Sequence, residues 1–75
     1  MIGDNIKFYR KKNQLTQDDI AEACNVTRQA VSKWENGASV PDLDKILKMS
    51  EIFGVSTDTL LKEEMELNER KTTFE

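Results

Sequence analysis

Two helices that follow one another with almost no connecting chain constrain this fold more than any other feature of the sequence. Thr16 is a good helix N-cap, and Asp19, three residues later, completes a capping-box pattern, so a helix is expected to begin at residue 16. Asn25 tolerates the left-handed conformation of a sharp helix exit, and Thr27 is the next capping residue. Because only about three or four residues join the two helices, they are predicted to cross at a steep angle.

The rest of the chain also has helical hydrophobic spacing, with no alternating run long enough for a strand. We expect a first helix over residues 2–13, a third over 27–36 that ends at Asn36-Gly37, a fourth over 42–53, and a short fifth capped by Ser56. Leu47 and Ile52 lie outside the main apolar stripe, and each could either be exposed at a dimer interface or belong to the edge of the core. The residues expected to face the core are Ile2, Ile6, Tyr9, Ile20, Ala21, Cys24, Val26, Val31, Trp34, Leu43, Ile46, Met49, Phe53, Leu60 and Leu61. The fold class is therefore all-α.

A chain of 75 residues supports a single hydrophobic core. We expect one domain over residues 1–62, followed by a mostly charged segment at 63–75. Three interpretations of that segment remain open: a charged tail, a helical extension that forms a dimer, and a linker to a further domain.

The side chains that most catalytic and metal sites require are scarce. The sequence has no histidine and a single cysteine, Cys24, which excludes an internal disulfide, a zinc site and a Cys-His nucleophile pair. It has no glycine-rich phosphate loop and no apolar run that could span a membrane. We therefore expect a cytoplasmic protein that is not an enzyme and uses no metal and no cofactor.

The net charge of -3 is unevenly distributed along the chain. Residues 1–40 carry six basic and five acidic side chains, whereas residues 41–75 carry five basic and nine acidic ones. Most of the acidity thus belongs to the second half. A basic surface on the first half remains compatible with a polyanionic partner.

The predicted helix over residues 27–36 has two different faces. Val31 and Trp34 are spaced for the core, which makes Trp34 an anchor and not a base-stacking residue. The opposite face carries polar and basic side chains: Arg28, Gln29, Ser32 and Lys33. Two capped helices with such a face are the elements of a helix-turn-helix, which places its second helix in the DNA major groove. By spacing alone, a helical hairpin with a solvated polar face fits equally well.

The run LTQDDIAEACNVTRQAVSKWENGASVPDLDKILKMSEIFGVSTDTLL, residues 15–61, closely resembles the phage-repressor type of helix-turn-helix family, which includes Cro and lambda-repressor-like (XRE) proteins. The preceding IGDNIKFYRKKN looks like that family's first helix, and Asn25 stands where the family often has glycine. The resemblance implies a compact five-helix lambda-repressor-like DNA-binding domain, with the helix-turn-helix at the second and third helices. It also implies a sequence-specific transcriptional regulator that acts as a repressor.

The resemblance further implies roles for individual residues. Base reading falls to Arg28, Gln29, Ser32 and Lys33, and phosphate contact to Gln17, Asn36, Gly37 and Ser39. Arg10 and Glu35 are expected to form a structural ion pair beneath the DNA surface. The expected partner is double-stranded DNA with a palindromic operator, bound by a homodimer. The alternative is a protein-interaction module, such as an antitoxin-like domain, in which DNA binding is secondary.

Overall fold

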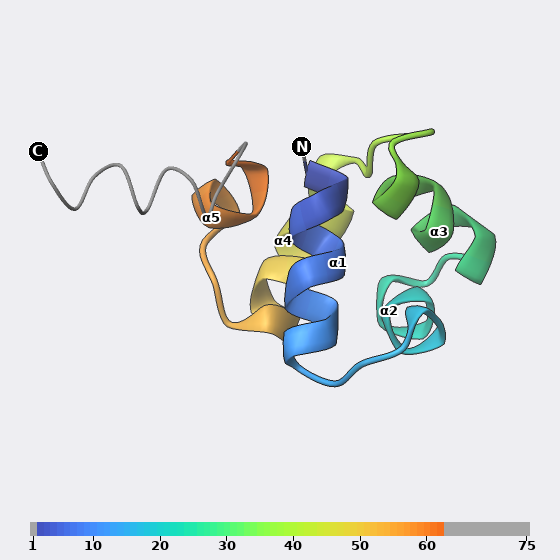
Figure 1. The fold of residues 1–75 in the computed structure, drawn as a ribbon, viewed down its shortest axis with the longest axis horizontal. Helices are drawn as coiled ribbons and strands as arrows, with labels where there is room; N and C mark the ends of the chain where they lie inside the picture. The colour runs from blue at the N-terminus through green and yellow to red at the C-terminus, as the bar shows by residue number, and fades with distance from the viewer. Residues whose placement is uncertain (1, 63–75) are drawn as a thin grey trace, which may run out of the picture.

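The computed structural model describes residues 2–62 as five α-helices arranged around one core, with no strand among these residues. The helices are α1 (Ile2–Lys12), α2 (Gln17–Cys24), α3 (Arg28–Asn36), α4 (Leu43–Phe53) and α5 (Thr57–Leu61). In Figure 1, α2 and α3 lie on one side of α1, α5 lies on the other, and α4 passes behind it. The predicted all-α fold is confirmed. The segment 63–75, with its three interpretations, lies outside the described residues.

Local side-chain chemistry sets the ends of the helices as the sequence predicts. The Thr16 hydroxyl accepts a hydrogen bond from the Asp19 amide at 3.0 Å, and the Asp19 carboxylate accepts one from the Thr16 amide at 2.8 Å. Asn25 ends α2 with φ 60° and ψ 46°, and Gly37 ends α3 with φ 85°. Both positions need the left-handed backbone that Asn and Gly adopt at least cost.

Each of the five helices contributes one completely buried side chain to the centre of the domain. These side chains have 0% relative exposure, and they are Ile6, Ile20, Val31, Met49 and Leu60. Around them pack Tyr9, Ala21, Cys24, Trp34, Ile46 and Phe53, with Ile2, Val26 and Ile52 partly buried at the edge. The rings of Tyr9 and Phe53 stack with their centroids 6.1 Å apart. One core therefore fixes the orientation of all five helices.

Two residues that the sequence assigned to the core are exposed. Leu43 is the first residue of α4 and is 65% exposed, because the apolar stripe of α4 extends one turn beyond the edge of the core there. Leu61 is 48% exposed, whereas its neighbour Leu60 is fully buried. Successive residues point about 100° apart around a helix, and in this short last helix the core covers Leu60 and leaves Leu61 at the surface. Both predictions were wrong at the end of a helix.

Two contacts at the first helix close the bundle. Asn5 is 3% exposed, and its Nδ2 donates to the carbonyl oxygens of Leu60 and Lys62 at 2.7 and 2.5 Å, which ties the end of α5 to α1. Gly3 lies so close to α3 that a Cβ there would be 2.2 Å from the Trp34 carbonyl oxygen. No helix within residues 2–62 is both long and apolar enough to cross a membrane.

Candidate nucleic-acid interface

The turn between α2 and α3 is fixed by backbone hydrogen bonds and by the core. The Val26 amide donates to the Ala21 carbonyl at 2.9 Å, directly after the left-handed residue Asn25. The Thr27 hydroxyl then caps α3 by accepting from the Ala30 amide at 3.1 Å. With Val31 and Trp34 buried on one face of α3, its opposite face is held in a single orientation toward solvent.

The outer face of α3 carries the four side chains assigned to base reading: Arg28, Gln29, Ser32 and Lys33. Arg28, Gln29 and Lys33 are exposed, and Ser32 is half-buried. Arg28 and Gln29 occupy the first turn of the helix, and Ser32 and Lys33 follow one turn later. The structure thus brings these four residues together on one solvent-facing surface. Arg and Gln are the side chains that can pair bidentately with guanine and adenine, respectively.

The backbone amides that follow α3 are already occupied. The Gly37 amide donates to the Trp34 carbonyl at 3.4 Å, and the Ser39 amide donates to that of Lys33 at 3.3 Å. Asn36 accepts from the Ala38 amide through its Oδ1 at 3.0 Å. A phosphate contact through the amide of Gly37 or Ser39 would have to share these bonds, whereas the Asn36 Nδ2 and the Ser39 hydroxyl would not.

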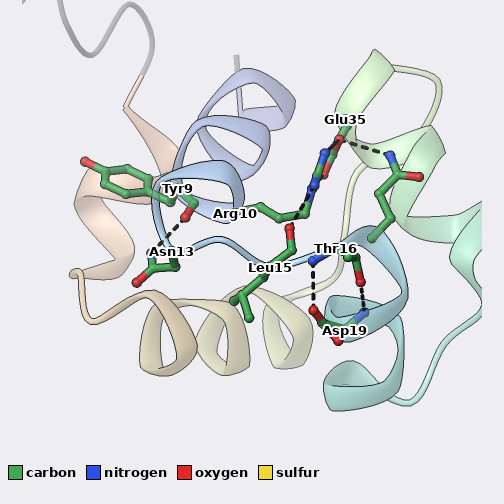
Figure 2. Close-up of polar contacts among 8 residues, drawn as sticks. Tyr9, Arg10, Asn13, Leu15, Thr16, Asp19 and Glu35 are labelled. Carbon is green, nitrogen blue, oxygen red and sulfur yellow. Dashed lines mark hydrogen bonds and ion pairs between the residues drawn. The ribbon is translucent and has the colours of Figure 1, made fainter.

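Glu35 connects three helices beneath this surface (Figure 2). The Arg10 Nε and Nη2 lie 2.6 and 3.1 Å from its Oε2 and Oε1, forming the ion pair that the resemblance implies. The Arg10 side chain is 12% exposed and the Glu35 side chain 5%. The hydrogen bond to Glu35 raises the pKa of Arg10, with burial opposing it, so the guanidinium stays charged. Arg10 also donates to the Leu15 carbonyl at 3.0 Å.

Gln17, the residue assigned to phosphate contact at the start of α2, belongs to the same group. Its Nε2 donates to the Glu35 Oε1 at 3.1 Å, so its amide is held beside the end of α3. The side chain is half-buried. Gln17 thus has a defined position before any ligand arrives, and its Nε2 has a second N–H besides the one bonded to Glu35.

Sequence reasoning missed a charged contact beside the outer face of α3. Asp18, in the first turn of α2, forms an ion pair with Arg28, with 3.4 Å between Oδ1 and Nε. The sequence offers no reason to expect this pair, because an acidic residue in the first turn of a helix is already explained by its favourable interaction with the helix dipole. The packing of α2 against α3 is what brings these two first turns together.

The family assignment rests on the whole helical domain. A family model described as helix-turn-helix matches residues 6–60. The chain belongs to this helix-turn-helix family. The prediction of the phage-repressor (XRE) type is confirmed, since a solved structure of the P22 c2 repressor with a synthetic operator superposes with a TM-score of 0.77. That match has 31% identity and covers 83% of this chain and 94% of the other.

Other members of the helix-turn-helix family are similar over most of the chain. An uncharacterised SPbeta prophage-derived transcriptional regulator, YonR of Bacillus subtilis, is 42% identical over 62 residues, which are 83% of this chain and 57% of that protein. A solved complex of the SinR and SinI proteins matches with a TM-score of 0.78 and 31% identity, and covers 97% of this chain and 75% of the other. The chain spans little more than half the length of YonR and of YqaE, another uncharacterised transcriptional regulator of Bacillus subtilis.

The helix-turn-helix domain offers little other chemistry. Between residues 2 and 62, no three acidic or cysteine side chains are grouped so that they could hold a metal ion. Cys24 is buried, and burial raises the pKa of its thiol, although the charges of Lys45 and Lys48 oppose this rise. The thiol is therefore protonated and poorly nucleophilic at neutral pH.

Proposed function

We propose that residues 1–62 form the DNA-binding domain of a transcriptional repressor, and that α3 reads base edges in the major groove of a specific operator. The observation that carries the proposal is the outer face of α3, where Arg28 and Gln29 project from the first turn of a helix anchored by Val31 and Trp34. Helix-turn-helix proteins place the first residues of this helix against the bases. The similarity to a repressor in complex with its operator supports this use of the fold.

The proposed roles follow from where each side chain lies. Arg28 and Gln29 would read bases, and Ser32 and Lys33, one turn later, would contact a base or the adjacent backbone. Gln17 lies at the start of α2, and Asn36, Gly37 and Ser39 lie at the end of α3 and just after it. These residues would contact phosphates, which fixes the domain on the duplex. A regulator of this kind acts in the cytoplasm and catalyses no reaction.

A homodimer on a palindromic operator completes the proposal. A single module of this size buries about 600 to 1,000 Å² on DNA, so useful specificity requires two copies, with half-sites roughly 34 Å apart. An exposed apolar patch follows α3 in the chain: Val40, Leu43 and Leu47 are 70%, 65% and 46% exposed. Leu43 and Leu47 are one turn apart on α4, and we propose that a second copy of the chain covers this patch.

The decisive experiment combines site selection with substitution. Selection from random duplexes should yield a consensus, and binding to it should weaken with salt, with a log-log slope that rises by about 0.9 for each phosphate neutralised. Arg28→Ala and Gln29→Ala should each lower affinity for the consensus by about 1 to 3 kcal/mol and relax the preference at particular base pairs. Lys48→Ala, which removes an exposed charge from α4, is the matched control and should keep the preference.

Two results would contradict parts of this proposal. If Arg28→Ala weakened binding to consensus and random DNA by the same factor, Arg28 would not read bases. If Leu43→Ser left both sedimentation and the cooperativity of operator binding unchanged, the patch would not be the dimer contact.

The second candidate function is protein interaction. The similarity to SinR in its complex with SinI extends over nearly the whole chain, and the second half of this chain is acidic. If the chain does not bind DNA, or if its DNA binding does not respond to salt, the result favours this candidate and rejects the repressor.

A further inference from the structure

A carboxylate lies beside the guanidinium of Arg28. The side chains of Arg28 and Asp18 are 61% and 76% exposed, and the Arg28 Nε lies 3.4 Å from the Asp18 Oδ1. Among residues 2–62, Asp18 is the only side chain that pairs with this guanidinium. The next carboxylate, Asp19, is different, because it is occupied by the capping box with Thr16.

The chemistry of the guanidinium gives this contact a consequence. The group is planar, with one N–H on Nε and two on each terminal nitrogen. A carboxylate at Nε leaves the outer edge formed by Nη1 and Nη2 available, and that edge presents two parallel donors. Guanine offers two neighbouring acceptors, O6 and N7, in the major groove, so this edge fits guanine end-on.

The Asp18 carboxylate also affects the binding of DNA of any sequence. Asp18 adds a negative charge beside Arg28, where it repels phosphates whatever the base sequence. An arginine without such a neighbour is free to turn to a phosphate, a contact that carries no sequence information. The pair should therefore lower the affinity for random DNA more than the affinity for a site with guanine under Arg28.

We propose that Asp18 is a positioning residue that determines specificity: it holds the Nε side of Arg28, directs the terminal edge toward guanine, and opposes phosphate contact by this arginine. This inference rests on the proposed function of α3. On this inference, the first turn of α2 contributes to base discrimination through Asp18, in addition to the phosphate contact proposed for Gln17.

The test uses the 75-residue chain and three duplexes: the selected consensus, the consensus with the guanine that depends on Arg28 replaced, and a random sequence. Asp18→Asn removes the charge and keeps the size of the side chain. Glu22→Gln is the matched control, since it removes an exposed carboxylate one turn later on α2. We expect Asp18→Asn to reduce the ratio of consensus to random affinity by about two- to fivefold, mainly through tighter random binding, and Glu22→Gln to leave the ratio unchanged.

A double-mutant cycle shows whether the effect passes through Arg28. In the Arg28→Ala background, Asp18→Asn should no longer change the ratio. The inference is overturned if Asp18→Asn and Glu22→Gln have equal effects, or if the effect of Asp18→Asn persists without Arg28. Failure of the proposed function is recognised separately, because the unaltered chain would then show no preferred duplex at all.

Discussion

Replacing Glu35 with alanine removes the acceptor on which α1, α2 and α3 converge. Three hydrogen bonds are lost at once, two from Arg10 at 2.6 and 3.1 Å and one from Gln17 at 3.1 Å. Arg10 keeps its bond to the Leu15 carbonyl, but its guanidinium loses the opposite charge. Since Glu35 is the main reason that the pKa of Arg10 is raised, and an arginine does not deprotonate at neutral pH, the variant holds an uncompensated positive charge.

The burial of the pair determines the size of the effect. Removing one partner of a buried ion pair costs about 3–5 kcal/mol, whereas an exposed pair contributes about 0–1 kcal/mol. The side chains of Arg10 and Glu35 are 12% and 5% exposed, which places them near the buried case. Because Arg10 keeps one hydrogen bond and some contact with water, we expect a loss of about 3 kcal/mol. This loss is a large share of the free energy of unfolding of so small a domain, because folded proteins are stable by only about 0.05–0.15 kcal/mol per residue.

Urea unfolding followed by circular dichroism measures this loss. With a slope of about 1 kcal/mol/M, the unfolding midpoint should fall by about 3 M. Glu51→Ala, which removes an exposed carboxylate from α4, is the control and should change the free energy of unfolding by less than about 0.5 kcal/mol. The double variant Arg10→Met/Glu35→Leu should recover most of the loss, because no unpaired charge remains. A Glu35→Ala effect below about 1 kcal/mol, or no recovery in the double variant, would refute the reasoning.

Three further predictions concern other contacts of the fold. Gly3→Ala should destabilise the domain by about 1–3 kcal/mol in urea unfolding, because the new Cβ would meet the Trp34 carbonyl oxygen. Gly54→Ala is the control: a Cβ there has no atom within 4 Å, so the substitution should cost only the left-handed backbone strain of about 1 kcal/mol. Thr16→Ala breaks the capping box and should cost about 1 kcal/mol; an effect near zero would show that the box does not stabilise α2. Burial raises the pKa of the Cys24 thiol, so this thiol ionises at a lower pH in the unfolded chain than in the folded domain. The free energy of unfolding should therefore fall as pH rises above 9.0 toward the folded pKa, and Cys24→Ala should show less of this fall when unfolding is measured across that range.

Much of the candidate site could be predicted from short stretches of sequence. The positions of Arg28, Gln29 and Lys33 on one face follow from helical periodicity once Val31 and Trp34 are assigned to the core. The partners of these side chains could not be predicted in this way. Asp18 reaches Arg28 only because two helices cross.

Features that depend on residues within about four positions of one another could be predicted from the amino-acid sequence. The capping box of Thr16 and Asp19 and the left-handed Asn25 are of this kind, as is the buried stripe of each helix. The exposure of Leu43 and the hydrogen bond from Asn5 to the end of α5 depend instead on how the helices pack together. The physical reason is that caps and periodicity act within one or two helical turns, whereas these contacts exist only after the packed core has fixed how the helices cross.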